Sequence, residues 1–383
     1  MKERNLTLSQ KQLKTWMVIQ RFIQKDITRQ QAADLLGLST RQISRLKKGV
    51  LTSGPESLIH KNTGRKPAHA VKEETKEAIL SLYSQPEFSE VNFLHFQEIL
   101  LADFGISLSC SALSSILKNA GKESPKKKKK RKRTHRCKRK PHPGQLLQID
   151  ATPFAWFGGS AKYALHGAID DATGKVVGLF LTSNECLYGY LRVMEQCCRR
   201  FGVPQSLYSD NHTMFRSPKT GTFTVEELLD GKQVHLTQFG RAMHELGTDL
   251  IFAGSPQAKG RVERLWGTLQ SRLPVEFAKR GIQTLAEANR FLEETYLEQF
   301  NSRFAVEAEG SSLFVPIGDA TDLDAILCVK HKRKTDAAGV FSFKNRCFQI
   351  LDAGFPLISA HKEITVLVHP NRLCKRAEAL LQR

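Results

Sequence analysis

Three acidic residues have the types and positions of a metal-binding catalytic set. Asp150 closes one apolar run, Asp210 follows a second, and Glu263 lies about two turns into a helix that is expected to begin at Pro256. Carboxylates are hard ligands for Mg²⁺, and two such ions can clamp the attacking and leaving oxygens of a phosphodiester. The set therefore predicts cutting and joining of DNA with two Mg²⁺ ions, for which Mn²⁺ can substitute.

The segments around these acids predict an α/β domain. Strands are expected where apolar runs are bounded by turn residues, at 145–150, 163–170, 175–182, 206–209 and 249–253. Helices are expected at 185–201, at 237–246 and from Pro256, with residues 171–174 as the turn between the second and third strands. The order βββαβαβα predicts an RNase H-like catalytic core with a mixed sheet at residues 143–274, in which the acids converge from strand ends and a helix.

Residues 1–63 are typical of a helix-turn-helix DNA-binding domain, with helices expected at 13–23, 28–36 and 40–47. Ala33, Gly37 and Ile43 supply a small contact residue, a glycine free to take positive φ in the turn, and an anchor under the last helix. That helix carries outward-facing side chains that can reach base edges and phosphates, namely Arg41, Gln42, Ser44, Arg45 and Lys47. The alternative is an ordinary helical hairpin with a solvated basic face.

A short basic segment and a second helical unit follow. Residues 64–70 include Arg65 and Lys66, which either enter a minor groove or belong to a plain linker. Residues 71–125 are expected to form a second helical DNA-binding domain, with helices at 71–83, 88–104 and 109–118.

Positive charge is concentrated in two stretches of the chain. Residues 1–70 carry 14 Lys and Arg against 4 Asp and Glu, and residues 126–140 carry 12 Lys and Arg with no acid, so the two together exceed the net charge of +20. Mutual repulsion should leave the basic linker at 126–142 disordered without a partner, and we expect it to tether the protein to DNA phosphates. A solvated linker and a nuclear-import signal are the alternatives.

The C-terminal part changes character twice. Residues 275–320 predict a helical linker with an amphipathic helix at 285–300, and residues 321–383 predict a small β-barrel. Its strands are expected at 326–331, 340–343, 347–351 and 364–368. Lys330, His331, Lys332, Arg333 and Lys334 are expected at one hairpin. The sequence leaves open whether this domain binds DNA or a second subunit.

Four motifs lie in the expected core. They are Gln-Ile-Asp-Ala at 148–151, Asp-Asp-Ala-Thr-Gly at 170–174, Tyr-Ser-Asp at 208–210, and Ser-Pro-Gln-Ala-Lys-Gly-Arg-Val-Glu-Arg-Leu-Trp-Gly-Thr-Leu-Gln at 255–270. Together they resemble the integrase core of bacterial insertion-sequence transposases, most closely the ISNCY type, over about residues 140–305. The resemblance implies that the residues matching Asp150, Asp210 and Glu263 are the DDE metal ligands.

The chain departs from the wider family pattern at two places. The interval between Asp210 and Glu263 is longer than in many retroviral-type integrases, and residues 216–236 account for much of the excess. His212 stands where a glycine is common, which affects the fine geometry of the loop after Asp210. Beside the acids, three cations are expected to hold the DNA backbone, with a solvated face as the alternative: Lys259, Arg261 and Arg264.

Other candidate residues have plainer explanations. Asp170 and Asp171 are expected to be turn residues, because aspartate favours turns through its own hydrogen bonds. Glu276 is a rival of Glu263, but it lies outside the glycine-led basic motif. His212 and His244 lack metal-like spacing and are expected to be structural or to face DNA.

Composition excludes several classes of protein. The eight cysteines lack the paired short spacing of a zinc site and are expected to be reduced. No signal peptide is evident, and no apolar run approaches about 18 residues, so neither secretion nor membrane insertion is indicated. A cytoplasmic, nucleoid-associated bacterial protein is expected.

The combined interpretation is a DDE transposase that acts as a homo-oligomer on double-stranded DNA. It is expected to bind its element's terminal repeats, cleave their 3′ ends and join them to target DNA. One alternative is a non-catalytic DNA-binding regulator derived from a transposase, against which the intact acids argue. The other is a structure-selective RNase H-like nuclease, which needs no sequence-reading helices.

Overall fold

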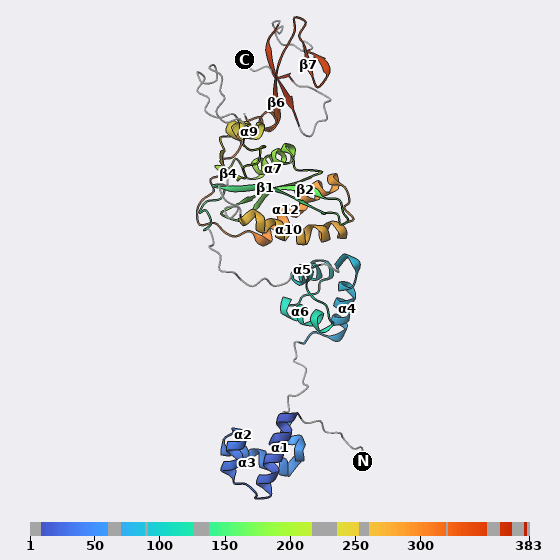
Figure 1. Cartoon of the computed structure of the whole chain (residues 1–383), viewed down its shortest axis with the longest axis vertical. Helices are drawn as coiled ribbons and strands as arrows, with labels where there is room; N and C mark the ends of the chain where they lie inside the picture. Colours follow the sequence, from blue (N-terminus) through green and yellow to red (C-terminus); the bar gives the residue numbers. More distant parts are fainter. Residues whose placement is uncertain are drawn as a thin grey trace. The chain divides into compact units, whose positions relative to one another are not determined.

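The computed structural model describes residues 9–59, 70–88, 91–125, 138–216, 236–252, 260–318, 321–350, 361–369 and 379–380. The chain forms two compact units, Met1–Glu77 and Ala78–Arg383. Many of their helices and strands are labelled in Figure 1. Arg65, Lys66, Lys259 and residues 126–137 lie outside the described residues.

Within the described residues, no helix has both the length and the apolar character needed to cross a bilayer, and the six cysteines are free thiols, as expected.

The first unit consists of three helices and a short 3-10 helix. They are α1 (Gln10–Ile23), α2 (Arg29–Leu36), α3 (Thr40–Ser53) and η1 (Gly54–Leu58). Ser9, Thr28 and Ser39 each begin a helix with a capping box, in which the third helical residue is a glutamine that returns the hydrogen bond. The cap at Ser9 explains why α1 begins three residues earlier than predicted.

The turn between α2 and α3 meets the packing demands predicted from the sequence. Gly37 has φ of 62°, in the left-handed region that glycine adopts without strain. Ala33 is buried between the helices and Ile43 is fully buried under α3. The three residues therefore position α3 as a helix with one face turned outward.

Three further helices form a separate hydrophobic cluster: α4 (Glu73–Tyr83), α5 (Phe93–Phe104) and α6 (Cys110–Asn119), with the short 3-10 helix η2 (Pro86–Phe88). Phe96 and Leu100 on α5 are fully buried in it. On its other side α5 faces α10 (Gly260–Lys279), where Glu98 accepts two hydrogen bonds from Arg272 at 2.6 and 2.7 Å. The boundary between the two compact units falls within α4.

A five-stranded mixed sheet forms the centre of the second unit, in the order β3-β2-β1-β4-β5. Its strands are β1 (Leu147–Phe154), β2 (Tyr163–Asp170), β3 (Val176–Thr182), β4 (Ser206–Ser209) and β5 (Asp249–Phe252). The first three are antiparallel, and β4 and β5 run parallel to β1. The strand and helix order is the predicted one.

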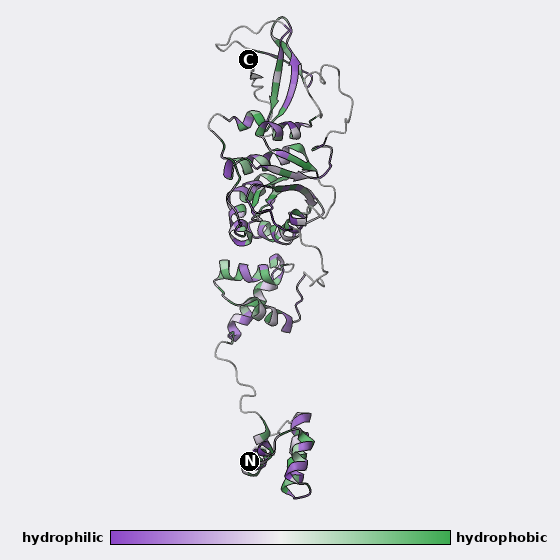
Figure 2. Ribbon diagram, turned by 90° about the vertical axis from the view of Figure 1, so that its left-hand side faces the viewer, coloured by the Kyte–Doolittle hydropathy of each residue, from purple (hydrophilic) through white to green (hydrophobic). Residues whose placement is uncertain are grey.

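Helices cover both faces of this sheet. One face packs against α7 (Leu187–Arg200) and α9 (Gln238–Leu246), and the other packs against α10, α11 (Leu285–Phe291) and α12 (Leu297–Phe304). Strands β2 and β3 are buried along almost their whole length, which explains their continuous apolar sequence. In Figure 2 the helices of this unit carry both green and purple residues, as expected for helices that pack one face on a sheet.

Strand β1 is longer than predicted, so the expectation that it ends on Asp150 is wrong. Asp150 is its fourth residue, and pairing with β2 continues to Phe154 opposite Tyr163. The sequence pattern missed this extension because Thr152 and Pro153 interrupt the apolar run. The predicted helix start at Pro256 lies outside the described residues, and α10 is described from Gly260.

The free edge of β3 is covered by side-chain amides. Asn289 and Asn301 each bond both the N–H and the C=O of one strand residue, Leu181 and Val176 respectively, at 2.6–2.8 Å. Gln196 on α7 does the same at Leu179. The predicted helix at 285–300 is found as α11 and α12, joined by a single π-helical turn, η4 (Leu292–Tyr296).

The π-helical turn explains how both asparagines reach this edge. A regular helix returns to the same face after about 11 residues, whereas Asn289 and Asn301 are 12 apart. The wider turn takes up the extra residue. The helix then spans about 17 Å between the asparagines, the same length as the five residue steps of the strand from Val176 to Leu181.

The C-terminal region differs from the predicted arrangement. The strand expected at 326–331 begins later, as β6 (Val329–Lys334), because Ile326 belongs to the short helix α13 (Leu323–Ile326). Asp322 caps this helix, and Arg241 bonds the carbonyls of Ile326 and Cys328. The basic residues 330–334 therefore lie along β6, and the expectation of a hairpin there is wrong.

The described C-terminal strands form two sheets. Strand β6 pairs with β9 (Glu363–Val368), which also pairs with β10 (Ala379–Leu380). Strands β7 (Val340–Phe343) and β8 (Arg346–Gln349) form a separate hairpin. A closed barrel stays a prediction.

Candidate active site

The two aspartates are brought together by the register of two parallel strands. Strand β1 pairs with β4 at Leu147–Leu207 and Gln148–Tyr208. Continued by two residues, this register sets Asp150 beside Asp210, the first residue after β4. Both residues are partly exposed at this end of the sheet.

The turn after β4 fixes the backbone that carries Asp210. Its Oδ1 accepts a hydrogen bond from the backbone N–H of His212 at 3.0 Å, which is the local turn that aspartate favours. Phe215 then anchors the segment in the core, with its ring edge-on to the rings of Tyr190 and Phe239. His212 is thus exposed and structural in the turn, where Nδ1 accepts from the N–H of Met214.

Helix α10 lies along β1 in a matched register. Side chains from alternate positions of β1 contact it in order: Gln148 accepts from the N–H groups of Arg261 and Val262, Asp150 accepts from the indole of Trp266, and Thr152 bonds Gln270. The Trp266 Nε1 to Asp150 Oδ2 distance is 3.0 Å. Four residues of a helix and two residues of a strand each span about 6–7 Å, so the contacts recur at matching intervals along α10 and β1.

This register decides which way Glu263 faces. Residues on an α-helix are separated by about 100°, and Val262 and Trp266 face the sheet. On one side of the sheet-facing row formed by Val262 and Trp266, Arg261 pairs with Asp171, which comes just after β2. Glu263 lies on the opposite flank, toward β4 and Asp210, and it is exposed. Among the described residues no three His, Cys, Asp or Glu side chains lie close enough to hold a metal ion, so the three-acid site stays a prediction.

Glu276, the rival acid, is engaged elsewhere. It accepts a hydrogen bond from His95 of α5 at 3.0 Å and also pairs with Arg280. Burial alone would raise its pKa, but the hydrogen bond from His95 and the charge of Arg280 lower the pKa of Glu276 to about 2. It is about 20 Å from Glu263 along the helix. Glu276 therefore joins α10 to α5.

Asp170 and Asp171 hold the turn that closes the β2–β3 hairpin. Asp170 accepts from the N–H of Gly144 and from the N–H and hydroxyl of Thr173 at 2.6–3.0 Å. Asp171 accepts from the N–H of Lys140 at 2.8 Å and from the Gln148 side chain at 3.1 Å. Both are buried, as suits the predicted structural role.

Comparison with known proteins identifies the family. The integrase core domain family matches residues 140–238. The transposase for insertion sequence IS1202 of Streptococcus pneumoniae is 35% identical over 367 residues, which cover 88% of this chain and 77% of the relative. A second relative named as a transposase, y4bF of Sinorhizobium fredii, is 31% identical over 344 residues, with 89% and 73% covered. The chain belongs to the insertion-sequence transposases.

Solved structures overlap the transposase only loosely. A chain of the simian T-cell lymphotropic virus intasome in complex with PP2A regulatory subunit B56 gamma has 16% identity and a TM-score of 0.33, covering 75% of this chain and 88% of that chain. The HTLV-2 integrase catalytic core domain in complex with magnesium has 18% identity and a TM-score of 0.27, with 39% and 82% covered. Family membership therefore rests on the sequence matches.

The candidate DNA contacts of the transposase differ in how free their side chains are. On α3, Arg41 and Arg45 are exposed and pair with no acid in the described residues. Gln42 bonds Ser39 in the capping box, Ser44 bonds its own helix, and Lys47 lies over the ring of Phe22. At the core, Arg264 is exposed, whereas Arg261 is mostly buried in its ion pair with Asp171. A DNA contact by Arg261 stays a prediction.

Two residues near the aspartates of the transposase were not predicted from its sequence. The buried hydroxyl of Tyr190 on α7 donates to Glu185 at 2.6 Å. Burial, the hydrogen bond with Glu185, and the charges of Glu185, Asp150 and Asp210 raise the pKa of Tyr190 well above its usual value. The sequence carries no signal for this cluster, because it depends on how α7 packs on β1.

A buried histidine lies beside this tyrosine. His166 on β2 has its ring edge-on to Tyr190, bonds the carbonyl of Phe180 through Nδ1, and accepts from the N–H of Cys186 through Nε2. Burial lowers the pKa of His166 to about 4, which its backbone hydrogen bonds only partly offset. The imidazole is therefore neutral in the folded protein at pH 7.

Stability of the second unit is expected to fall as the pH drops from about 6.5 to about 4. In this window His166 gains a proton in the unfolded chain before it does in the folded one, so the free energy of unfolding falls by up to about 3 kcal/mol. Denaturant unfolding across this pH range measures the effect. His166→Gln should flatten the dependence of unfolding free energy on pH above pH 4.5, where the protonation of Glu276 does not yet contribute. An equally steep curve in this variant would contradict the assignment of the effect to His166.

Trp266→Phe is expected to lower DNA cleavage about 10-fold with DNA affinity unchanged. The variant keeps a ring in the core but removes the indole N–H that orients Asp150, and loss of such a supporting bond costs about 10–100-fold. Trp156→Phe is the matched control, because its indole bonds only the carbonyl of Tyr163. Equal activities for the two variants, at equal folded fractions, would exclude this role.

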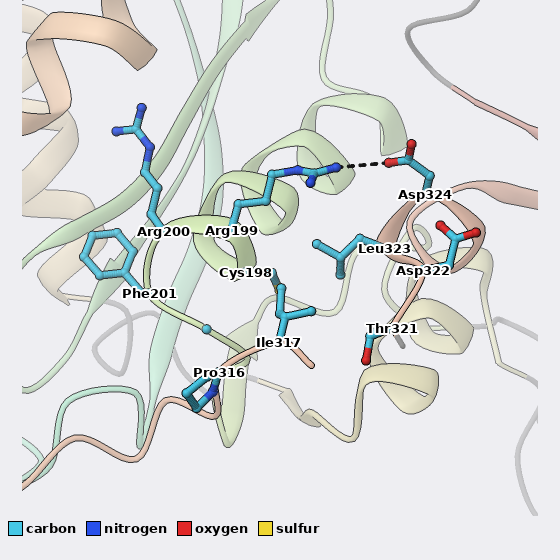
Figure 3. Close-up of a pocket in the computed structure, with 11 residues that line it drawn as sticks. Cys198, Arg199, Arg200, Phe201, Pro316, Ile317, Thr321, Asp322, Leu323 and Asp324 are labelled. Atoms are coloured by element: carbon cyan, nitrogen blue, oxygen red, sulfur yellow. Dashed lines mark hydrogen bonds and ion pairs between the residues drawn. The ribbon is translucent and has the colours of Figure 1, made fainter. Parts of the chain in front are cut away.

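A cavity of about 670 Å³ lies away from these acids, between the end of α7 and the segment before β6 (Figure 3). Arg199 on α7 pairs with Asp324 across it at 3.2 Å. None of the candidate acids lines this cavity.

Proposed function

We propose that the protein binds the terminal repeats of its own element, cleaves the 3′ ends and joins them to target DNA. The observation that supports the proposal is the parallel register of β1 and β4, which on continuation aligns Asp150 with Asp210, together with the bond from Trp266, on the helix that bears Glu263, to Asp150. Family membership supports transposition as the overall activity.

The residues present fit a divalent metal by their donor chemistry. Asp150, Asp210 and Glu263 supply only hard carboxylate oxygens, which suit Mg²⁺, with Mn²⁺ as a substitute. Two bound ions would supply a lowered pKa for the attacking hydroxyl and charge stabilisation of the phosphoryl transition state. Trp266 would hold the Asp150 carboxylate in one orientation, and the His212 N–H would do the same for Asp210.

The reaction needs no covalent bond to the protein. In the first step water attacks the phosphodiester at the element's end, which leaves a 3′-hydroxyl and a 5′-phosphate. In the second step that 3′-hydroxyl attacks a target phosphodiester and displaces a target 3′ oxygen. Because both steps use one site and two DNAs, we propose that a homo-oligomer holds the DNAs together.

The decisive experiment combines the purified full chain with the inverted repeats that flank its gene. Specific binding of those repeats, followed by cleavage that requires Mg²⁺ or Mn²⁺, is the expected result. Binding without cleavage would instead favour a non-catalytic regulator. Cleavage that ignores the end sequence would favour a structure-selective nuclease.

Arg41→Ala or Arg45→Ala is expected to relax discrimination between the terminal repeat and scrambled DNA by about 1–3 kcal/mol, if the side chain reads a guanine. The reason is that both are exposed on the helix that the Gly37 turn presents. Competition binding with the two DNAs measures it. Lys11→Ala, an exposed cation on α1, is the control. Equal weakening on both DNAs would reduce α3 to a phosphate-binding helix.

A further inference from the structure

Three arginines gather where the chain passes from the basic tract to the five-stranded sheet. Arg139 donates from Nη1 to the carbonyl of Ala172 at 3.0 Å. Arg261 donates from Nε to the Asp171 carboxylate. Arg264 follows Arg261 by one helical turn on α10. The hairpin turn after β2 therefore brings residues from two distant parts of the chain into one cluster.

Their mutual approach is visible in their electrostatics. Burial, followed by the positive charges of Arg261 and Arg264, lowers the pKa of Arg139, while Asp171 and Asp170 act in the opposite direction. The charges of Arg261 and Arg264 thus both act on Arg139. Positive groups repel each other, so the fold must hold them there.

The turn is built to hold them. Asp171 binds Arg261, the N–H of Lys140 and Gln148 at the same time. Gly174, with φ of 70°, leaves room for Arg139, because a Cβ there would be 3.2 Å from its Nη1. The backbone at 139–140 and the start of α10 are therefore fixed to one turn, about 10–13 Å along β1 from Asp150.

Only one of the three arginines is neutralised by this arrangement. Asp171 pairs with Arg261, and Asp170 accepts hydrogen bonds from the N–H of Gly144 and from the N–H and hydroxyl of Thr173. Arg139 and Arg264 are exposed, and within the described residues neither forms an ion pair with an acid. The cluster presents the Arg139 guanidinium, held against the carbonyls of Asp171 and Ala172, and the exposed Arg264 over a buried support.

We propose that Arg139 and Arg264 together bind one phosphate of the DNA backbone, and that Arg261 supports them from Asp171 without touching DNA. Guanidinium groups match phosphate oxygens through paired, charge-assisted hydrogen bonds. A DNA phosphate bound at this point would connect the DNA that the basic tract holds to β-strand β1, which carries Asp150. The inference rests on the proposed function, since it assumes a DNA substrate.

Neutral-phosphate scanning tests this site directly. Full-length protein carrying Asp150→Ala binds terminal-repeat duplexes in which one phosphate at a time is replaced by an uncharged methylphosphonate. One position should lower affinity about 10-fold, as expected for a charge-assisted contact. Arg139→Ala and Arg264→Ala should each bind unmodified DNA about 10-fold more weakly and lose sensitivity at that same position. Sensitivity lost at two different positions, or retained in both variants, would overturn the proposal.

Two further variants distinguish a phosphate site of fixed geometry from unspecific attraction by nearby positive charge. Lys138→Ala removes a neighbouring exposed cation and should leave the position-specific sensitivity intact. Asp171→Asn should weaken that sensitivity although every arginine remains. Thermal melting confirms folding, and Arg139→Lys provides a milder change at the same position, with partial sensitivity expected. The scan needs no cleavage, so its failure would leave metal-dependent cleavage by the wild type, and hence the proposed function, untouched.

Discussion

Alanine at Asp150, Asp210 or Glu263 is expected to lower cleavage and joining of DNA by about 10³-fold or more, with binding to the terminal repeat nearly unchanged. Each substitution removes a carboxylate from the site that stabilises the developing charge, where single contributors are worth about 10²–10³-fold. Binding survives because α3 belongs to the other compact unit. Cleavage of labelled repeat DNA in Mg²⁺ or Mn²⁺ and a parallel binding titration measure the two effects.

The matched control is Glu276→Gln, on the same helix as Glu263. Glutamine keeps the size of the side chain and can still accept from His95, so cleavage should persist. The opposite result, substantial cleavage by Glu263→Ala and its loss in Glu276→Gln, would transfer the role to Glu276. That outcome would also require α10 to move relative to β1, because Glu276 faces α5.

Replacing the basic residues of 126–136 by glutamine is expected to weaken binding to every DNA sequence alike and to flatten its salt dependence. Positive side chains without a fixed geometry attract the DNA phosphates and do not distinguish one base from another. Engagement of 6–9 phosphates would change the affinity of the wild type by about 10³–10⁵ between 50 and 200 mM salt. The slope of log affinity against log salt is the measurement.

A tract with the same residues in permuted order is the control for this effect. It should behave as the wild type does, because only its charge matters. Arg139 and Lys140 stay in place in both variants, so the cluster at Asp171 is not disturbed. An unchanged slope in the glutamine variant would show that the tract is a spacer or a protein contact.

Local sequence signals predicted most of the fold. Strand β2 and the turn at Asp171 were predicted correctly because apolar runs and turn residues act over a few positions. The capping residue Thr28 and the turn at Gly37 likewise defined α2. The end of β1 was not predictable in this way, because its last four residues are held by pairing with β2.

The sequence supplied the candidate acids, which stay a prediction, but it carried no signal for the side chains that support them. The register of β1 and β4, the indole of Trp266 and the hydroxyl of Tyr190 act between segments that are distant in sequence. Arg261 shows the same limit. Its position in a basic motif predicted a DNA contact, whereas its ion pair depends on where the β2–β3 turn lies.

The amides along β3 constrain how copies of this protein can associate. A strand edge whose N–H and C=O groups are already bonded cannot template another chain, and Asn289, Asn301 and Gln196 supply those bonds at three positions. Continuous sheets across two subunits are thus blocked on this side. Any oligomer assembled on DNA therefore has to form without strand pairing at this edge, which the π-helical turn helps to keep covered.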